Sequence, residues 1–98
     1  MISIIVPVFN TEPLYIDECI ISIRTFFDQN NDFEYELIIV NDGSTNKLTL
    51  DFLNSLVLRD NWILIHQKNK GLSAARNTGI FKAKVGSPFK VKPVPGWC

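Results

Sequence analysis

The sequence has little of what usually defines a class of protein. Among its 98 residues it has two cysteines and one histidine, and neither Cys19 nor Cys98 has a Cys or His partner at zinc-ligand spacing. Two cysteines are also too few for a disulfide framework, which favours a reducing compartment. No apolar run approaches the roughly 20 residues needed to span a bilayer, and no signal peptide is visible. We therefore expect a cytoplasmic chain, with membrane association left open for a full-length protein.

Net charge is absent as well. Ten basic residues balance ten acidic ones, so the chain has no global attraction to nucleic acid or to an anionic membrane. No nucleic-acid partner is expected, and any anionic ligand must be held by local features. The hydrophobic content of 46% is typical of a soluble globular protein, and the length suits one small domain.

Hydrophobic periodicity predicts three strands that alternate with three helices. Proline cannot donate a ladder hydrogen bond, so the first strand should end near Val6, before Pro7. Ser44 is expected to cap the second helix, whose inner face would consist of Leu48, Phe52, Leu53, Leu56 and Val57. The expected strands cover residues 2–6, 36–40 and 62–66, and the expected helices cover 13–28, 45–58 and 72–84. This β-α-β-α-β-α order implies a three-layer α/β/α fold with parallel strands.

The stretch from Glu36 to Thr45 dominates the sequence. Its run Leu37–Val40 is uninterrupted and apolar, which is typical of a central strand covered on both faces. The polar residues that follow leave Asp42 at the carboxyl edge of the sheet, where open α/β folds bind ligands. On local grounds alone, the same residues fit an ordinary turn between a strand and a helix.

Three motifs resemble one known family. They read I-I-V-P-V-F-N-T-E at 4–12, I-I-V-N-D-G-S-T at 38–45 and N-K-G-L-S-A-A-R-N-T-G at 69–79. In this order and spacing they resemble the N-terminal half of the family 2 glycosyltransferases, which have the GT-A fold. The resemblance covers about 80 residues, and it implies a Rossmann-like, nucleotide-binding half domain over residues 1–84.

The resemblance also implies a ligand, a nucleotide-sugar donor that is most often a UDP-sugar. Pro7 and Val8 match residues whose backbone lies along the uracil and ribose, and Asn10 and Glu12 belong to the same loop. Asp42 matches the carboxylate that reads the base. A carboxylate accepts well from the uracil N3–H, whereas cytosine has no proton at N3 to donate.

The third motif adds two candidate binding residues. Gly71 would let the backbone approach the nucleotide closely, and Arg76 could face either a phosphate or an internal carboxylate. The alternatives for Arg76 stay open at this point.

The sequence departs from the family after the third motif. Members continue into an acidic D-x-D-type motif that holds a divalent metal, but residues 84–98 contain no Asp or Glu. We therefore assign this chain no metal ligand, no cofactor and no catalytic residue, and we expect Mn²⁺ or Mg²⁺ only in the full-length enzyme. Residues 85–98, which contain three prolines, are expected to form an extended or disordered tail that does not look native. The chain would then be a truncated and inactive donor-binding part of an enzyme that glycosylates a saccharide or lipid-linked acceptor.

Two other interpretations compete with a glycosyltransferase. The first is a non-catalytic nucleotide-binding module. The second, a receiver-like or dinucleotide-binding domain, ranks last because no G-x-G-x-x-G follows the first strand. In either case a three-stranded sheet leaves an edge and an apolar face uncovered, so a homodimer is expected.

Overall fold

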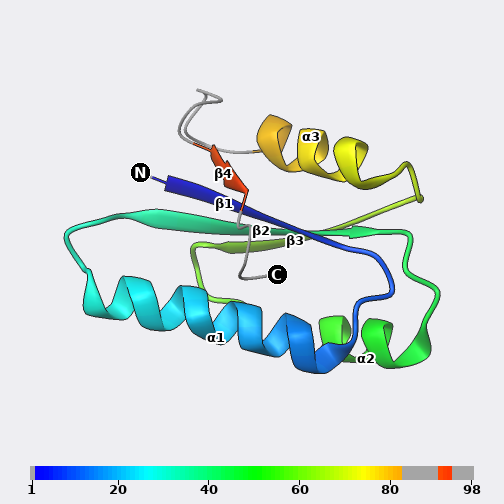
Figure 1. Ribbon diagram of the computed structural model, residues 1–98, viewed down its shortest axis with the longest axis horizontal. Coiled ribbons are helices and arrows are strands. Elements are labelled where there is room, and N and C mark those ends of the chain that lie inside the picture. Colours follow the sequence, from blue (N-terminus) through cyan, green and yellow to red (C-terminus); the bar gives the residue numbers. More distant parts are fainter. Residues whose placement is uncertain (1, 83–90, 94–98) are drawn as a thin grey trace.

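The computed structural model describes residues 2–82 and 91–93, which form a parallel sheet with helices on both faces (Figure 1). Strands and helices alternate along the chain as the sequence predicts. In chain order the elements are β1 (Ile2–Val8), α1 (Pro13–Gln29), β2 (Tyr35–Asp42), α2 (Lys47–Ser55), β3 (Trp62–Gln67), α3 (Leu72–Lys82) and β4 (Val91–Pro93).

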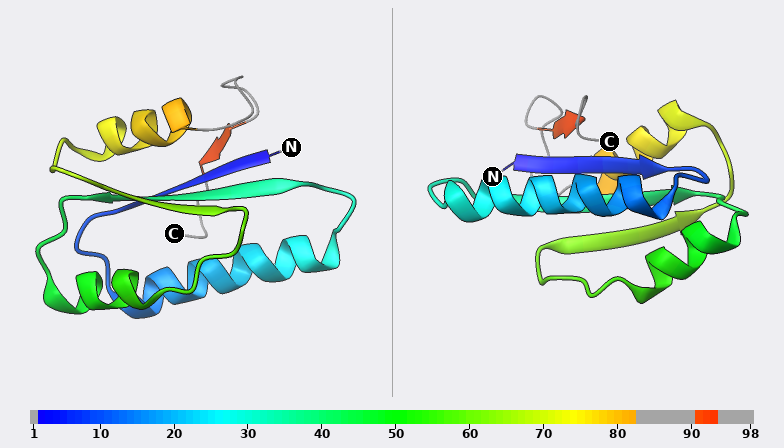
Figure 2. Two further views of the ribbon diagram at one scale, coloured as in Figure 1. Left: turned by 180° about the vertical axis from the view of Figure 1, so that it is seen from behind. Right: turned by 60° about the horizontal axis from the view of Figure 1, so that its bottom comes forward.

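The strand order is β3-β2-β1-β4, and every neighbouring pair is parallel. The helices α1 and α2 cover one face of the sheet and α3 covers the other, which gives three layers (Figures 1 and 2). This arrangement confirms the predicted α/β fold. It also confirms the run Leu37–Val40 as the middle of a central strand, since β2 lies between β1 and β3 and all four side chains are fully buried.

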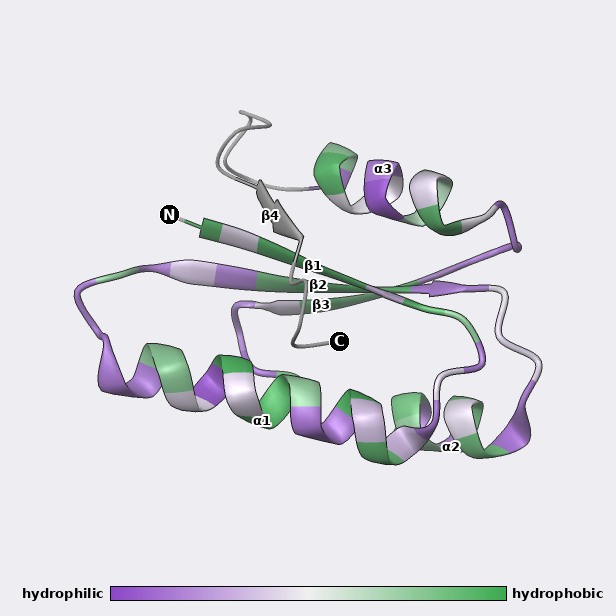
Figure 3. Ribbon diagram, in the orientation of Figure 1, coloured by the Kyte–Doolittle hydropathy of each residue, from purple (hydrophilic) through white to green (hydrophobic). Residues whose placement is uncertain are grey.

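Alternation along the strands divides the core into two clusters. On the α1 and α2 face, Ile4, Val6, Leu37 and Ile39 pack against one stripe of α1. That stripe consists of Ile16, Cys19, Ile20, Ile23 and Phe27. On the α3 face the cluster is smaller, with Ile5, Ile38, Val40 and Ala75. Figure 3 shows the resulting contrast between the apolar strands and the striped surface of α1.

The prediction that β1 ends before Pro7 is wrong, because β1 continues to Val8. The Ile2 N–H donates to the Glu34 carbonyl on the β2 side. The backbone N–H and C=O groups of even-numbered residues in β1 therefore point toward β2, and those of odd-numbered residues point toward β4. The Pro7 nitrogen therefore points toward β4, which pairs only with Ser3–Ile5. No ladder hydrogen bond to β2 is lost at Pro7.

The second helix is shorter than predicted. It begins at Lys47 because Asn46, rather than Ser44, is its N-cap, and the Asn46 side chain accepts a hydrogen bond from the Thr49 N–H at 3.1 Å. It ends at Ser55, so Val57 lies beyond it and is 87% exposed instead of facing the core. Leu48 is exposed as well, since Thr49 and Leu53 form the buried face.

A fourth strand lies where an extended or disordered tail was predicted. Val91–Pro93 pair with Ser3–Ile5 at the edge of the sheet, and proline is tolerated in such an edge strand. The expectation for the rest of residues 85–98 falls outside the described residues. No helix in the described part of the chain is long and apolar enough to span a bilayer.

At Gly79, α3 packs closely against the sheet. A Cβ atom at this position would lie 2.5 Å from Cγ2 of Ile5. A glycine that weakens the helix therefore has a packing reason, since α3 could not sit this close to β1 with a larger residue there.

Candidate functional site

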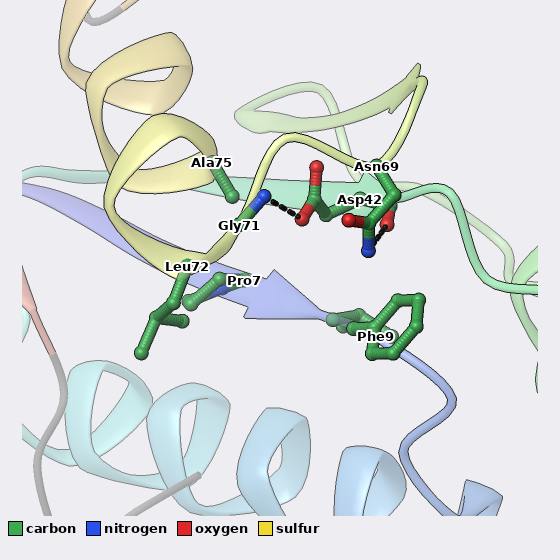
Figure 4. A pocket seen from close by; sticks show the side chains of 8 residues that line it. Pro7, Phe9, Asp42, Asn69, Gly71, Leu72 and Ala75 are labelled. Carbon is green, nitrogen blue, oxygen red and sulfur yellow. Dashed lines mark hydrogen bonds between the residues drawn. The ribbon is translucent and has the colours of Figure 1, made fainter.

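A pocket opens at the carboxyl ends of β1 and β2, beside the start of α3 (Figure 4). Its volume is about 140 Å³. The polar part of its lining comes from Asp42 and Asn69, and Phe9 and Leu72 contribute half-exposed apolar side chains. The complete lining is Pro7, Val8, Phe9, Asp42, Asn69, Gly71, Leu72 and Ala75.

Asp42 is the polar centre of this pocket, and it is 3% exposed. Alternation along β2 places its side chain on the α3 face, as for Ile38 and Val40. Its Oδ1 accepts hydrogen bonds from the Gln67 side chain at 2.8 Å and from the Lys70 N–H at 2.9 Å. Its Oδ2 accepts one from the Gly71 N–H at 2.9 Å. A carboxylate offers about four acceptor positions, so one on Oδ2 is left by these three bonds.

These bonds favour the ionised carboxylate. The hydrogen bond from Gln67 is the main cause that lowers the pKa of Asp42, and the backbone N–H groups of Lys70 and Gly71 lower it further. Burial acts in the opposite direction but does not prevail. The nearby start of α3 carries positive partial charge and also suits an anion. Asp42 is therefore a negative, hydrogen-bond-accepting group at neutral pH.

A second set of contacts orients the groups that bind Asp42. Gln67 is held from α3, because the Thr78 hydroxyl donates to its Oε1 at 2.6 Å. Asn69 donates through its side-chain amide to the Asp42 carbonyl at 3.2 Å. The loop after β3 is thus tied to the end of β2 at several points.

Two glycines with positive φ shape these loops, one because of close packing and one because of backbone conformation. Gly43 has a φ of +73°, and a Cβ atom there would lie 2.5 Å from the Asn69 backbone nitrogen. Gly71 has a φ of +94°, but a Cβ atom there would meet nothing within 4 Å. The freedom required of Gly71 is therefore conformational, and it directs the Gly71 N–H toward Asp42.

Asn10 fastens the loop after β1 to the loop after β2. Its Oδ1 accepts hydrogen bonds from the Thr45 and Asn46 N–H groups, both at 2.8 Å. Its own N–H donates to the Ser44 hydroxyl at 3.0 Å. Asn10 has a φ of +50°, which asparagine tolerates better than most residues. Asn10 thus holds the loop that begins at Phe9 in place, but it does not itself line the pocket.

The predicted site residues divide into two groups. Pro7, Val8, Asp42 and Gly71 come together at the pocket. Glu12 does not, because it is the N-cap of α1 and lines a separate hollow of about 280 Å³ together with Asn10.

Arg76 also lies away from the pocket lining. It is on α3 with an exposed side chain, and within residues 2–82 and 91–93 no hydrogen bond or ion pair is formed by it. The described residues thus give Arg76 no internal carboxylate partner.

The sequence reasoning missed several residues that line the pocket or bind Asp42. Phe9 directly follows β1, and Gln67 lies opposite Asp42 in the pairing of β2 with β3. Polar or aromatic residues at the carboxyl ends of neighbouring parallel strands are the signal that could have identified both. Asn69 gives no such signal, because its role depends on the close approach to Gly43.

The described residues do not fit the divalent metal that the family resemblance implies. Within residues 2–82 and 91–93, no three His, Cys, Asp or Glu side chains are placed to hold a metal ion. The carboxylate in the pocket already accepts three hydrogen bonds from the protein. We therefore assign no metal-dependent step to these residues.

The strand order defines a Rossmann-like α/β half domain, and the pocket lies at the carboxyl edge of its sheet. A family model described as glycosyl transferase family 2 matches residues 3–85, and the chain belongs to this family.

Curated bacterial relatives agree with this assignment. An uncharacterized glycosyltransferase, EpsJ of Bacillus subtilis, is 44% identical over 86% of this chain and 23% of its own length. The glycosyltransferase GlyA of Streptococcus pneumoniae is 44% identical over 81% of this chain and 11% of its own length. An uncharacterized glycosyltransferase of Haemophilus influenzae is 37% identical over 86% of this chain and 32% of its own length. The chain thus spans a third or less of these relatives.

Proposed function

We propose that residues 1–84 form the donor-binding part of a cytoplasmic glycosyltransferase, and that the donor is a UDP-sugar. The observation that carries this proposal is the position of Asp42, an ionised carboxylate at the base of a pocket with apolar sides. In the same proposal the full-length enzyme transfers a hexose to a saccharide or lipid-linked acceptor, as in polysaccharide biosynthesis. A divalent ion, Mn²⁺ or Mg²⁺, belongs to that full-length enzyme and rests on the resemblance alone.

The chemistry of the pocket supports uracil as the base. One acceptor position remains on Oδ2 of Asp42 after its three hydrogen bonds, and the uracil N3–H can donate to it. The ring of Phe9 lies on the rim, where a planar base can stack on it (Figure 4). Cytosine would present an acceptor to the same carboxylate, which is repulsive.

The pocket residues support the choice of base, but they do not bear on how the phosphates and the sugar are bound. Arg76 remains a proposed phosphate ligand only if the nucleotide extends beyond the pocket along α3. Asn10 supports the loop between Phe9 and Glu12 through its contacts to residues 44–46, so its proposed contribution to binding is indirect.

The experiment is a calorimetric titration of the chain with UDP, with and without Mn²⁺, and with CDP for comparison. We expect saturable binding of UDP that does not depend on Mn²⁺, and weaker binding of CDP. Absence of UDP binding by a cooperatively folded chain would refute the proposal, and equal affinity for CDP would refute the assignment of the base.

A matched pair of variants tests the pocket. Phe9 and Phe81 are both exposed, at 52% and 85%, but only Phe9 lines the pocket. Phe9→Ala should lose a stacking contact of about 1–3 kcal/mol and bind UDP about 5- to 150-fold more weakly. Phe81→Ala should bind UDP like the parent chain. Equal affinity of the two variants would place the nucleotide elsewhere.

A non-catalytic nucleotide-binding module is the alternative for this chain. A full-length transferase would turn over a sugar donor and a full-length binding module would not, whereas the 98-residue chain should show no turnover in either case. Sugar transfer from a UDP-sugar by this chain, above a control without protein, would contradict the assignment of no catalytic residue to it.

We also propose that the chain forms a homodimer through its incomplete sheet.

A further inference from the structure

The outer edge of β3 carries backbone groups that the sheet does not use. β3 is an edge strand, and β2 is its single neighbour in the described part of the sheet (Figure 2). The Leu37 N–H donates to the Asn61 carbonyl at 3.0 Å. The backbone N–H and C=O groups of odd-numbered residues in β3 therefore point toward β2, and those of even-numbered residues point outward. Within residues 2–82 and 91–93, the outward N–H and C=O groups of Leu64 and His66 have no backbone partner. Trp62 offers its carbonyl, because its N–H already donates to Arg59.

This edge lacks the features that protect edge strands from pairing. Proteins block such edges with proline, lysine or a bulge. The opposite edge of the sheet, β4, contains Lys92 and Pro93, whereas β3 has the sequence W-I-L-I-H-Q. The side chains of Ile63 and Ile65 are half-buried on the α3 face, and α3 packs against β1 and β2. Apolar surface therefore reaches the open edge.

We propose that two copies of this chain associate edge to edge through β3, antiparallel, about a two-fold axis at Leu64. In this register each Leu64 exchanges both hydrogen bonds with the partner's Leu64. Each His66 N–H then reaches the carbonyl of the partner's Trp62. The arrangement uses each unpaired outward group between the Trp62 carbonyl and the His66 N–H, and the sheet becomes continuous across the two copies.

Charge and side-chain complementarity favour antiparallel pairing about Leu64. Asp60 precedes β3 and Lys68 follows it, so this pairing brings the two opposite charges to the same end of the junction. Ile63 lies opposite the partner's Ile65, so apolar side chains meet across the junction. β3 itself contains no Asp, Glu, Lys or Arg, so no like charges oppose the pairing of the two strands.

The association does not depend on the proposed nucleotide site. The pocket is lined by residues of β1, the end of β2, the start of α3 and the loops that follow β1 and β3, but by no residue of β3 itself. Antiparallel pairing points the carboxyl ends of the two sheets in opposite directions, so the two pockets would lie at opposite ends of the dimer. Failure of nucleotide binding would therefore leave this inference standing, and its own failure would leave the nucleotide site standing.

The test uses two double variants that differ by one residue. In Ile63→Lys with Ile65→Lys, every new lysine faces a lysine of the partner. In Ile63→Lys with Ile65→Glu, every new lysine faces a glutamate. Sedimentation velocity over a concentration series should show a dimer for the parent chain and for the lysine–glutamate variant. The lysine–lysine variant should dissociate at a concentration about tenfold higher or more.

The sedimentation results distinguish the β3 edge from other interfaces, and the Leu64 register from other registers. A monomeric parent chain at all concentrations would overturn the proposal, and an unchanged dimer in the lysine–lysine variant would move the interface elsewhere. Equal weakening of both variants would overturn the register, because an axis at Ile65 would set like charges at that position against each other.

A measurement on the parent chain needs no variant that could fail to fold. Amide hydrogen exchange at Leu64 and His66 should slow as protein concentration rises, because their N–H groups become bonded only in the dimer. Exchange at Ile63 and Ile65, whose N–H groups face β2, should change much less. Exchange at Leu64 that does not depend on concentration would overturn the proposal.

Discussion

Asp42 has a role in the protein that is independent of any ligand. It joins the end of β2 to the loop that begins α3, through bonds to Gln67, Lys70 and Gly71. The turn interpretation and the binding interpretation of its sequence context are therefore compatible. One carboxylate shapes the pocket and also lies at its base. Substitution of Asp42 would change both, which is why Phe9 is the better probe of binding.

Part of the stability of the chain should be lost in acid because Asp42 becomes protonated. Its pKa is lowered in the folded chain, so its contribution to stability is complete above the unfolded pKa, which is about 3.9, and is lost as pH falls through the lower folded value. The stability difference between the parent chain and Asp42→Asn should thus be constant near neutral pH and shrink below about pH 4. Urea unfolding at a series of pH values measures it.

Asp51→Asn is the control for this measurement, because Asp51 is an exposed carboxylate on α2. Its stability difference from the parent chain should be small. A difference for Asp42→Asn that stays constant down to pH 2 would show that its hydrogen bonds do not favour the ionised form.

Asn10 combines an unusual backbone conformation with four hydrogen bonds to residues 44–46. Both Asn10→Gly and Asn10→Ala remove its three side-chain bonds, but only alanine also carries the steric cost of a positive φ, about 1 kcal/mol or more. We expect Asn10→Ala to be less stable than Asn10→Gly by about 1 kcal/mol in urea unfolding. Asn10→Asp, which keeps an acceptor, should be the most stable of the three variants. Equal stability of the alanine and glycine variants would contradict the role of backbone strain.

At the scale of elements, α2 shows how capping and packing override an apolar pattern. The residues between Leu48 and Val57 have helical spacing, but the Asn46 cap sets the start of the helix. Thr49 then faces inward, and its hydroxyl donates to the Thr11 carbonyl at 2.8 Å. A buried threonine that binds a neighbouring loop is not visible in hydrophobic periodicity, which is why Leu48 was predicted on the inner face in place of Thr49. The prediction for Leu53 is confirmed.

The contact between α3 and β1 predicts that the effect of Gly79→Ala on stability changes sign when Ile5 is truncated. Gly79→Ala should destabilise the chain, because overpacking against Ile5 costs about 1–3 kcal/mol and the gain in helix propensity is about 1 kcal/mol. In an Ile5→Ala background the space is free, so the same substitution should stabilise by about 1 kcal/mol. Thermal or urea unfolding of the four chains measures this cycle. A stabilising Gly79→Ala in the parent chain would show that α3 can move away from β1 at little cost.

At the scale of the whole molecule, the alternation of strands and helices predicted the parallel three-layer fold. Buried strands and amphipathic helices determine such an order with few alternatives. The pocket was predictable only in part, since Pro7, Val8, Asp42 and Gly71 follow from the edge of the sheet and from the resemblance. Phe9, Gln67 and Asn69 depend on register and on a close contact between loops, which a sequence does not display.

The bonds from Asp42 to the third loop also bear on how the chain is made. Asp42 and Lys70 are separated by 28 residues. A growing chain that has been synthesised only through β3 can already pair β1, β2 and β3, but the Lys70 and Gly71 N–H groups that bind the Asp42 carboxylate do not yet exist. The pocket can therefore form only after the start of α3 has left the ribosome. A nucleotide can stabilise the finished domain, but it cannot act as a template for the earliest steps of its folding.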